Sequence, residues 1–484
     1  MTRFILVAAL LAAGPAWAKS KKAPEPVAAA VPPPPDPLGT QPEVPLPAAF
    51  TPATATASKL SNGASLWVIP NPTLPIFSLV VTVPGGSTLD PAGKEGTASL
   101  AMEMLRRGAG SRDAEAFAAE TGRRGLSIET GTGPDGSSIV LSGTTEQLEV
   151  GLDLVADMIL RPKLPAPELK KARELFVTSL QQNLSEPGWV AARTATSLWW
   201  GPSHPYGRPA DGTQAGLKKV GMGDIKKWHK AAWVSGGSKI TVSGAVDAAG
   251  IQAQVEQRLG APWKVKAPVA TSVPAPAMHR AEPIYLVDSP GSAQTGFYLV
   301  FPGLKAGHPQ APPARMGTIA LGGTFTSRLN ALLREKKGYT YGVRAALDEM
   351  HWGGTFVVRS RIRTDVTAPA LVDLMVELEG IRQGITYEEL VKAQGAFRQD
   401  VVSSLESVAG AAGAFSDAHE AGLAPDFLRT DLETASRVGV AGVKAAMGAY
   451  DISTGLVVLV GDKAIIEPEL KKSGFTLITT VTPP

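Results

Sequence analysis

The sequence contains no cysteine, few histidines and no long hydrophobic run after its N-terminus. Without cysteine, the 484-residue chain forms no disulfide bond, offers no thiolate to a metal and has no cysteine for an N-terminal lipid anchor. Its stability must therefore come from large hydrophobic cores, and the apolar content of 44% is enough to build them. The length predicts more than one domain.

Strong charge is also missing. The formal net charge is +3, and no basic block or basic–aromatic patch occurs along the chain. Nucleic acid is therefore not expected as a partner. After the N-terminus, no segment reaches about 18 apolar residues without a charge, so we expect no membrane span.

The first residues have the order of features found in a secretory signal peptide. Arg3 supplies a positive charge, the apolar run FILVAALLAA is too short to cross a bilayer, and small residues stand at Ala16 and Ala18. The alternative interpretation is a buried N-terminal helix. We expect residues 1–18 to be a cleaved signal peptide and the mature protein to be periplasmic or secreted.

A segment rich in proline and alanine, residues 19–57, follows and lacks hydrophobic periodicity. This composition predicts an extended, disordered spacer. For its last ten residues, an ordered arm lying over the surface is the alternative. Folded structure is expected to begin near Ser58.

Strand and helix patterns then occur in two similar series. In the first series, short β-branched runs predict strands and amphipathic periodicity predicts helices. The strands are expected at 65–71, 77–87, 126–144 (a hairpin turning at Pro-Asp-Gly) and 239–246, and the helices at 96–108, 113–125 (N-capped by Ser111), 145–160, 166–184 and 248–260. In the second series, strands are expected at 283–289, 295–303, 353–362 and 455–462, and helices at 312–338 (with a glycine interruption), 368–384 and 386–407.

The two series indicate an internal duplication. PELKKARELFVTSL resembles EELVKAQGAFRQDVVSSL, and KITVSGAVD resembles GLVVLVGDK, each pair about 220 residues apart. The fold class is therefore α+β, with two tandem homologous domains that each combine a mostly antiparallel sheet with helices packed on one face. We place the N-terminal domain at 58–262, a proline-rich linker at 263–283 and the C-terminal domain at 284–484.

Two segments give this arrangement a family resemblance. GGTFTSRLNALLREKKGYTYGV (322–343) and the helix GTASLAMEMLRRG (96–108) resemble signature segments of the insulinase/pitrilysin family of zinc peptidases, and the similarity covers about Ser58 to Val481. The resemblance implies two halves that close like a clam-shell around a cavity. It also implies a helix with the motif H-x-x-E-H, whose histidines bind zinc and whose glutamate activates water.

This chain departs from that motif at every position. Ser99 and Glu103 stand where the family has its two histidines, and Met102 stands at the position of the general base. The third zinc ligand of the family, a glutamate, should fall around 178–180, where no residue is acidic. We therefore interpret Ser99 and Met102 as helix-packing residues and Glu103 as a polar residue at a solvated cleft. We expect no metal and no intrinsic catalytic residue in this chain.

The remaining histidines do not replace the missing ligands. They are His204, His229, His279, His308, His351 and His419. No two of them lie within five residues of one another, so one helix cannot present a histidine pair to a metal.

The second half of the family's machinery is present. In the family, an arginine and a tyrosine seven residues apart hold the substrate and polarise the scissile carbonyl, and Arg334 and Tyr341 have this spacing here. A guanidinium and a phenol are suitable donors for such a role. The alternative is structural: Arg334 ends a helix and Tyr341 starts a strand. Tyr339 is a nearby competitor, and the glycine-rich LGGTF (321–325) is expected to be a flexible loop facing the substrate.

Relatives in this family split the work between two chains, one with the zinc motif and one with the arginine and tyrosine. The resemblance therefore implies that this chain is a non-catalytic subunit that binds unfolded peptide and works with a paralogous, zinc-bearing peptidase subunit. Zinc is then expected on the partner and no cofactor on this chain. Two alternatives stay open. One is a proteolytically inactive periplasmic scaffold or peptide-binding protein, and the other is a lone, divergent zinc metalloendopeptidase.

Overall fold

The computed structural model describes residues 50–268, 284–351, 353–450 and 454–483. The predicted signal peptide, most of the predicted spacer and the greater part of the predicted linker lie outside these ranges. Within them, no helix combines the length and the apolar character that crossing a membrane requires.

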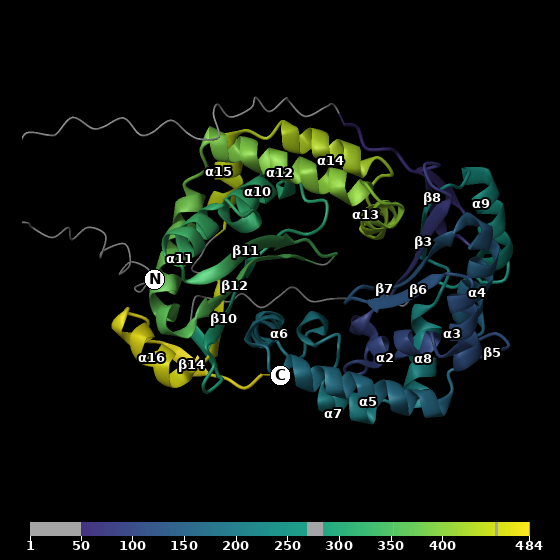
Figure 1. Ribbon diagram of the computed structural model, residues 1–484, viewed down its shortest axis with the longest axis horizontal. Coiled ribbons are helices and arrows are strands. Elements are labelled where there is room, and N and C mark those ends of the chain that lie inside the picture. Colours follow the sequence, from purple (N-terminus) through teal and green to yellow (C-terminus); the bar gives the residue numbers. More distant parts are fainter. Residues whose placement is uncertain (1–49, 269–283, 352, 451–453, 484) are drawn as a thin grey trace, which may run out of the picture. The chain divides into compact units, whose positions relative to one another are not determined.

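The N-terminal half alternates strands and helices from residue 56 to residue 260 (Figure 1). Its strands are β1 (Thr56–Lys59), β2 (Ser65–Pro70), β3 (Ile76–Pro84), β4 (Gly108–Ala109), β5 (Arg112–Asp113), β6 (Ser127–Thr132), β7 (Gly136–Thr144) and β8 (Lys239–Gly244). Its helices are α2 (Thr97–Leu105), α3 (Ala114–Arg123), α4 (Leu148–Leu160), α5 (Ala166–Asn183), α6 (Pro187–Trp200), α7 (Gln214–Lys219), α8 (Met222–Ala232) and α9 (Ala248–Val255), with short helical turns η1 (Ser87–Leu89), η2 (Thr145–Gln147), η3 (Pro205–Gly207) and η4 (Glu256–Gly260).

The C-terminal half has the same kind of order. Its strands are β9 (Ile284–Asp288), β10 (Gln294–Pro302), β11 (Thr340–Asp348), β12 (Thr355–Arg363), β13 (Leu456–Gly461) and β14 (Ile478–Thr480). Its helices are α10 (Ala311–Thr318), α11 (Thr367–Arg382), α12 (Tyr387–Leu405), α13 (Val408–Glu420), α14 (Phe427–Ser436), α15 (Val440–Gly448) and α16 (Lys463–Lys472), with helical turns η5 (Ile319–Gly323), η6 (Asn330–Lys336) and η7 (Thr364–Val366).

Sheet topology confirms the predicted duplication. The strands of the first sheet are ordered β1-β2-β8-β3-β7-β6, and those of the second β11-β12-β10-β13-β9-β14. When the second order is reversed, β9, β13, β10, β12 and β11 take the places of β2, β8, β3, β7 and β6. Most pairs in both sheets are antiparallel, with β2–β8, β9–β13 and β9–β14 parallel. The predicted α+β class with two homologous domains is therefore confirmed.

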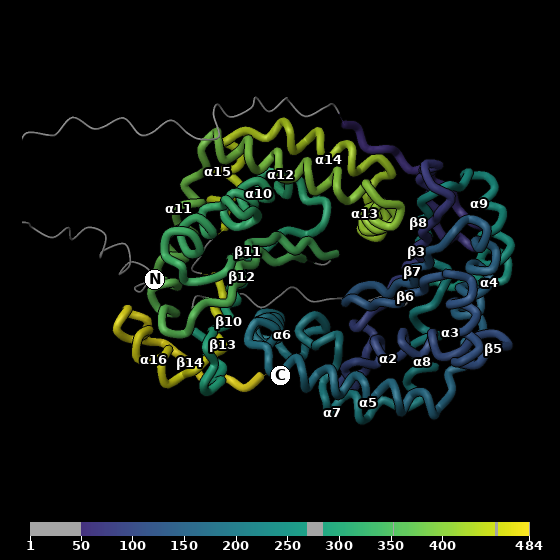
Figure 2. The backbone as a smooth tube through the Cα atoms, viewed as in Figure 1, coloured from purple at the N-terminus to yellow at the C-terminus, as the bar shows by residue number. Residues whose placement is uncertain are grey.

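Each sheet packs its own helices on one face, as predicted, but the other face is not left bare. In β2, Leu66 and Val68 belong to the large core formed with α2, α4, α5 and α8. Trp67 and Ile69 alternate with them and therefore point to the opposite face. There they pack against Phe415 of α13, a helix of the C-terminal half. Figure 2 shows the tube of α13 beside β8, and the two elements are in contact.

A helix of the N-terminal half, α6, covers one face of the second sheet in the same way. Val190 and Trp199 of α6 share a core with Tyr298 and Val300 of β10 and Val458 of β13. The two halves thus exchange helices, α6 in one direction and α13 in the other. The sequence analysis did not predict α6. It also did not predict the exchange, because a helix pattern does not reveal which sheet the helix will cover.

Polar contacts accompany the docking of α13. The imidazole of His419 stacks on the indole of Trp67, with ring centroids 4.1 Å apart and planes inclined by 6°. Its Nε2 lies 2.8 Å from Ser65 Oγ and its Nδ1 lies 3.1 Å from Thr241 Oγ1. Burial, together with the charge of Lys239, lowers the pKa of His419 to about 3. The helix therefore docks through a neutral imidazole.

Two local predictions need correction. The predicted spacer, 19–57, ends too late, since β1 begins at Thr56 and Ala55 is buried in the core cluster that contains Trp67. Asp113, and not Ser111, caps α3, because its side chain accepts a hydrogen bond from the backbone N–H of Ala116. The pairing of β4 with β5 keeps Ser111 in the connecting turn.

Candidate functional site

Helix α2 carries the positions where a zinc motif was expected, and their side chains are committed to other contacts. Ser99 Oγ donates a hydrogen bond to the backbone carbonyl of Ala210 at 2.8 Å. Met102 is 2% exposed and belongs to the main core of this half. These contacts agree with the prediction that both residues serve packing.

The N-terminus of α2 is fixed by an unusual buried carboxyl group. Asp90 accepts hydrogen bonds from the backbone N–H groups of Gly96 and Ala98, each at 2.8 Å. Burial raises its pKa to about 7, against the opposing effect of these donors and of Arg208. Gly96 has a φ of 95° and approaches the backbone of Gly212, so a side chain there would be strained and would collide. The position of the start of α2 is therefore set by Asp90 and by the close contact of Gly96 with Gly212.

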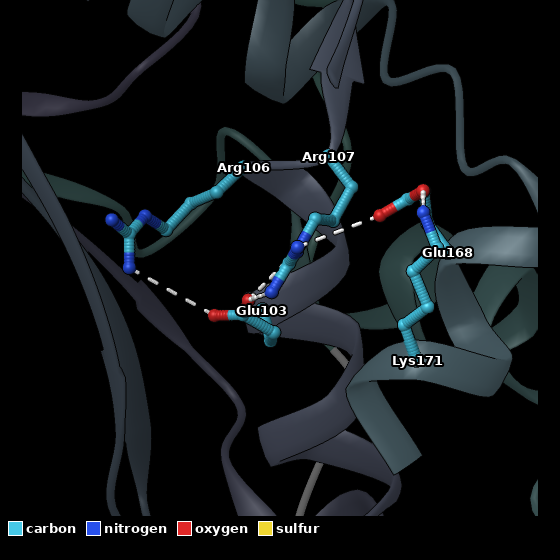
Figure 3. Close-up of polar contacts among 5 residues, drawn as sticks. All are labelled: Glu103, Arg106, Arg107, Glu168 and Lys171. Carbon is cyan, nitrogen blue, oxygen red and sulfur yellow. Dashed lines mark hydrogen bonds and ion pairs between the residues drawn. The ribbon is translucent and has the colours of Figure 1, made fainter. Parts of the chain in front are cut away.

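Glu103 forms an ion pair within the protein (Figure 3). Arg107 Nε donates to Glu103 Oε1 at 2.8 Å, and the Arg107 guanidinium also lies 3.4 Å from Glu168 Oε2 on α5. Lys171 donates to the second oxygen of Glu168 at 2.7 Å. Arg107 therefore stands between carboxylates from two helices, which the sequence alone did not indicate because 61 residues separate Arg107 from Glu168.

The residues in this region do not fit a zinc site. The position predicted for the distal ligand lies on α5, where Leu180 is buried and the Thr178 hydroxyl donates to the carbonyl of Glu174 at 2.9 Å. Glu103 is neutralised by Arg107, and the neighbouring carboxylate Glu168 is held by Arg107 and Lys171. In the described part of the chain, no three side chains of the metal-binding types gather to hold an ion. A cleft of about 460 Å³ remains beside Glu103, between α2, α3 and β6.

A larger cavity of about 580 Å³ opens in the C-terminal half, and it brings together the residues predicted for substrate binding. Arg334 from η6 and Tyr341 from β11 both line it, together with the glycine-rich segment Gly322–Phe325. The Arg334 guanidinium lies over the Phe325 ring, 3.9 Å from its centroid. Tyr341 is 88% exposed. The arginine and the tyrosine thus share one cavity, in which Tyr341 is exposed and the partly buried Arg334 also lies 3.4 Å from Glu335.

The exposure of Tyr341 has a local cause. The pairing of β11 with β12 shifts register between Thr340 and Val343, so Tyr341 falls within a β-bulge. Bulges turn a side chain away from its regular place in a sheet. Thr340 Oγ1 stabilises the irregularity, lying 2.9 Å from Ser360 Oγ and donating to the carbonyl of Arg361 at 2.7 Å.

Asn330 holds the cavity wall together, and sequence reasoning missed it. Its Nδ2 donates to the carbonyls of Thr324 at 2.8 Å and Val343 at 3.0 Å, and its Oδ1 accepts from the N–H of Val343 at 2.9 Å. The glycine-rich segment is thereby tied to β11. An asparagine within the apolar run LNALL was the signal that could have identified it, since a buried amide needs partners.

The glycine-rich segment is packed where the sequence predicted a flexible loop. Leu321 and Gly322 are buried in the π-helical turn η5. A Cβ at Gly322 would lie 2.7 Å from the backbone nitrogen of Ala345. Glycine is therefore needed for close approach to β11. Of the residues predicted to face the substrate, Gly322 to Phe325 line the cavity, and Phe325 is 58% exposed.

Tyr339 does not share this position. Its backbone N–H donates to the carbonyl of Leu333 at 2.8 Å, its ring lies beneath the Lys337 ammonium, and it is absent from the described cavity lining. The geometry therefore favours Tyr341 over Tyr339 for the predicted role. That role itself stays a prediction.

Comparisons with known proteins agree with the duplicated architecture. A family model described as "Insulinase (Peptidase family M16)" matches residues 68–197. A second one, described as "Peptidase M16 inactive domain", matches residues 219–397. The motif region of α2 lies within the first match, and the Arg334–Tyr341 segment lies within the second.

Individual relatives have low sequence identity to this chain, but the similarity extends over most of its length. An "Uncharacterized zinc protease YmxG" from Bacillus subtilis is 23% identical over 353 residues, covering 72% of this chain and 83% of the relative. An uncharacterized zinc protease from Mycobacterium tuberculosis is 24% identical over 331 residues, covering 68% and 75%.

Solved structures show the same fold over a larger share of the chain. A peptidase M16 inactive domain from Pseudomonas fluorescens aligns with a TM-score of 0.79 at 25% identity, covering 84% of this chain and 98% of its own. A protease from Helicobacter pylori aligns with a TM-score of 0.77 at 18% identity, covering 85% and 100%. At 18% identity, the second likeness concerns the fold alone.

Proposed function

The chain belongs to the insulinase family of peptidases, peptidase family M16, and from this premise we propose that it is the non-catalytic, substrate-binding subunit of a heteromeric zinc peptidase that cleaves unfolded peptides. Its partner is a paralogous subunit that carries H-x-x-E-H and the zinc. The chain is exported through residues 1–18 and works in the periplasm or outside the cell.

One observation carries the proposal: the side chains at the motif positions of the N-terminal half are engaged within the protein, whereas those of the C-terminal half line an open cavity. In the N-terminal half, Ser99 and Met102 pack, and Glu103 pairs with Arg107. In the C-terminal half, Arg334 and Tyr341 line an open cavity held in shape by Asn330. A binding cavity without its own catalytic centre suits a helper subunit, because the reacting groups can come from another chain.

The unpaired edge strands of the two sheets are a further argument for peptide binding. Among the residues that the structure describes, strands β6 and β11 each pair with a neighbour on one side only. An extended peptide can add to such an edge through main-chain hydrogen bonds, without a fixed sequence. The cleft beside Glu103 borders β6, and the larger cavity borders β11.

The test is copurification followed by reconstitution. The full-length chain, tagged at its C-terminus and expressed in its own host, should copurify with a protein that contains H-x-x-E-H. The complex should cleave unfolded peptides, and a chelator should stop the reaction. The pure chain should bind no stoichiometric zinc and cleave nothing, since its residues do not form the site.

The alternatives predict different outcomes of the same experiment. A scaffold or peptide-binding protein would bind peptides in a complex that never cleaves them. A lone metallopeptidase would retain one zinc per chain after purification and cleave peptides unaided. Either result would overturn the helper-subunit proposal.

A further inference from the structure

A row of arginines follows one face of the second sheet. Strand β12 carries Arg359, Arg361 and Arg363 at alternate positions, and all three are exposed. Alternate residues of a strand share a face. Val357, two positions before Arg359, belongs to the core beneath α6, so the arginines continue the same face beyond that core.

Strand β11 adds a fourth arginine where repulsion is strongest. Arg344 is the direct cross-strand partner of Arg359. Like charges directly opposite each other in an antiparallel pair repel and destabilise the sheet. Within the described ranges, neither guanidinium forms a hydrogen bond or an ion pair. Asp348, at the far end of β11, is the carboxylate on which the charge of Arg359 acts, and it does so without a direct ion pair.

The carboxylates that do pair with this row are exposed and replaceable. Arg361 lies 3.3 Å from Glu186, and Arg363 lies 2.6 Å from Asp365, with every one of these side chains more than half exposed. Exposed ion pairs of this kind contribute little to stability. A ligand carboxylate can therefore compete for the same guanidinium groups.

Part of this arginine row lies in the wall of the cavity that contains Arg334 and Tyr341. Arg344 and Arg361 line that cavity together with Arg334. Its described lining contains three arginines and no aspartate or glutamate. Phe325 and Tyr341 add aromatic surface beside these charges. A cavity with this lining concentrates negative charge and repels positive charge.

We propose that the arginine face of β11 and β12, together with the cavity, binds acidic segments of extended peptides. This inference rests on the proposed function and adds the chemical class of its substrate. Aspartate and glutamate side chains supply the direct ion pairs that Arg344 and Arg359 lack within the described residues. The free edge of β11 favours a peptide over a nucleic acid, because it offers main-chain hydrogen bonds that a peptide backbone can complete.

The experiment measures binding of three labelled, unstructured peptides of equal length to the purified full-length chain by fluorescence anisotropy. One peptide is rich in Asp and Glu, the second has Asn and Gln in their places, and the third has Lys and Arg. The acidic peptide should bind about tenfold more tightly than the neutral one, and the basic peptide should bind least. The advantage should shrink in 0.5 M salt, where the screening length for charge interactions is about 4 Å.

Two variants locate the effect. Arg344→Gln and Arg359→Gln should each weaken acidic-peptide binding by about three- to tenfold, the range expected for losing one ordinary hydrogen bond, and should weaken binding of the neutral peptide by less. The melting temperature of the free protein should stay constant or rise, because the repulsion between the two arginines is removed. A merely structural role would lower it. Arg437→Gln, which changes an exposed arginine just after α14, is the matched control and should change neither binding nor melting.

Equal affinity for the acidic and neutral peptides would overturn this inference and leave the proposed function standing. Equal or tighter binding of a single-stranded oligonucleotide of the same charge would also overturn it, in favour of a general anion surface. Failure of all three peptides to bind would instead overturn the proposed function, and this inference with it.

Discussion

The two halves of this chain share a fold but differ in the side chains at the clefts that border β6 and β11. In the first half, the protein supplies its own cation, Arg107, beside Glu103 and Glu168. In the second half, the cavity beside Arg334 and Tyr341 is left without a carboxylate in its described lining. The first region is neutralised by a cation between two carboxylates. In the second, Arg334 pairs with Glu335 and Arg361 with Glu186 at the rim, while Arg344 has no direct ion pair within the described residues.

This difference shows that fold and site are maintained separately. Both sheets keep the same strand order, and each receives a helix from the other half. The shared architecture is therefore supported by the exchanged cores and not by either site. Substitutions at the two sites should have correspondingly different consequences, which the following predictions compare.

The largest effect is expected at Tyr341. Replacing it with Phe removes a hydroxyl and little volume from an 88% exposed side chain, so folding should be unchanged. If the phenol donates to the developing oxyanion, kcat of the reconstituted complex should fall by roughly 10²–10³. Turnover and melting temperature should be measured on the same preparation.

Tyr339→Phe is the matched control for this variant, because Tyr339 is not among the described lining residues of the cavity. It should leave kcat unchanged. A Tyr341→Phe complex with wild-type turnover would remove Tyr341 from the mechanism. It would also bring the scaffold interpretation forward, unless Tyr339→Phe proved to be the inactive variant.

A smaller but structural effect is expected at Asn330. Asn330→Ala removes the side-chain partner of the N–H and carbonyl of Val343, whereas the Thr324 carbonyl keeps its hydrogen bond from the Ser327 hydroxyl. Unsatisfied buried groups cost about 1–3 kcal/mol, so the free energy of unfolding should fall by about that amount. Peptide binding should weaken as well, since the glycine-rich segment and β11 would no longer be tied together. Chemical denaturation and anisotropy measure the two effects, and a variant with full stability and full binding would contradict this role.

Sequence patterns predicted the repeated strands and the helices α2–α5 and α9–α12 because these depend on local periodicity, as in β8 and β13, but they missed α6–α8 and α13–α16. Spacing within a family signature also singled out Arg334 and Tyr341, which line one cavity and whose role stays a prediction. Sequence patterns could not predict the exchange of α6 and α13, the pairing of Arg107 with Glu168, or the opposition of Arg344 and Arg359. Each of these depends on residues that only the tertiary fold brings together.

The exchanged helix α13 gives a prediction about pH. The pKa of His419 is lowered to about 3 by burial and by Lys239, against an ordinary value of 6.5. Below pH 6.5 the unfolded chain therefore binds a proton that the folded chain does not, and stability falls as the pH drops toward 3. His419→Gln should lower stability at pH 7.5 by about 1–2 kcal/mol through lost hydrogen bonds and stacking.

The same variant should lose its share of the pH dependence. Between pH 6.5 and 4.5, its melting temperature should decline less steeply than that of the wild type, because glutamine does not titrate. Glu420 works in the opposite direction, since burial raises its pKa, but it is present in both proteins. Identical slopes for the two proteins would show that His419 does not titrate as stated.

The smallest effect is expected at Arg107, and it tests the first half of the comparison directly. Arg107→Leu removes the guanidinium between Glu103 and Glu168, yet Lys171 still pairs with Glu168, and Arg106 lies 3.9 Å from Glu103 (Figure 3). These groups retain contact with water, so the free energy of unfolding should change by no more than the 10–15% uncertainty of a denaturant extrapolation. Arg123→Leu, which breaks the exposed pair with Glu120 on α3, is the matched control and should behave alike. The variant should also bind no stoichiometric zinc by elemental analysis, because removing the internal cation creates no histidine and no third ligand. Zinc retained by Arg107→Leu and absent from Arg123→Leu would mean that Arg107 alone keeps a metal out of this half, and that the two halves differ by one side chain and not by a dismantled site.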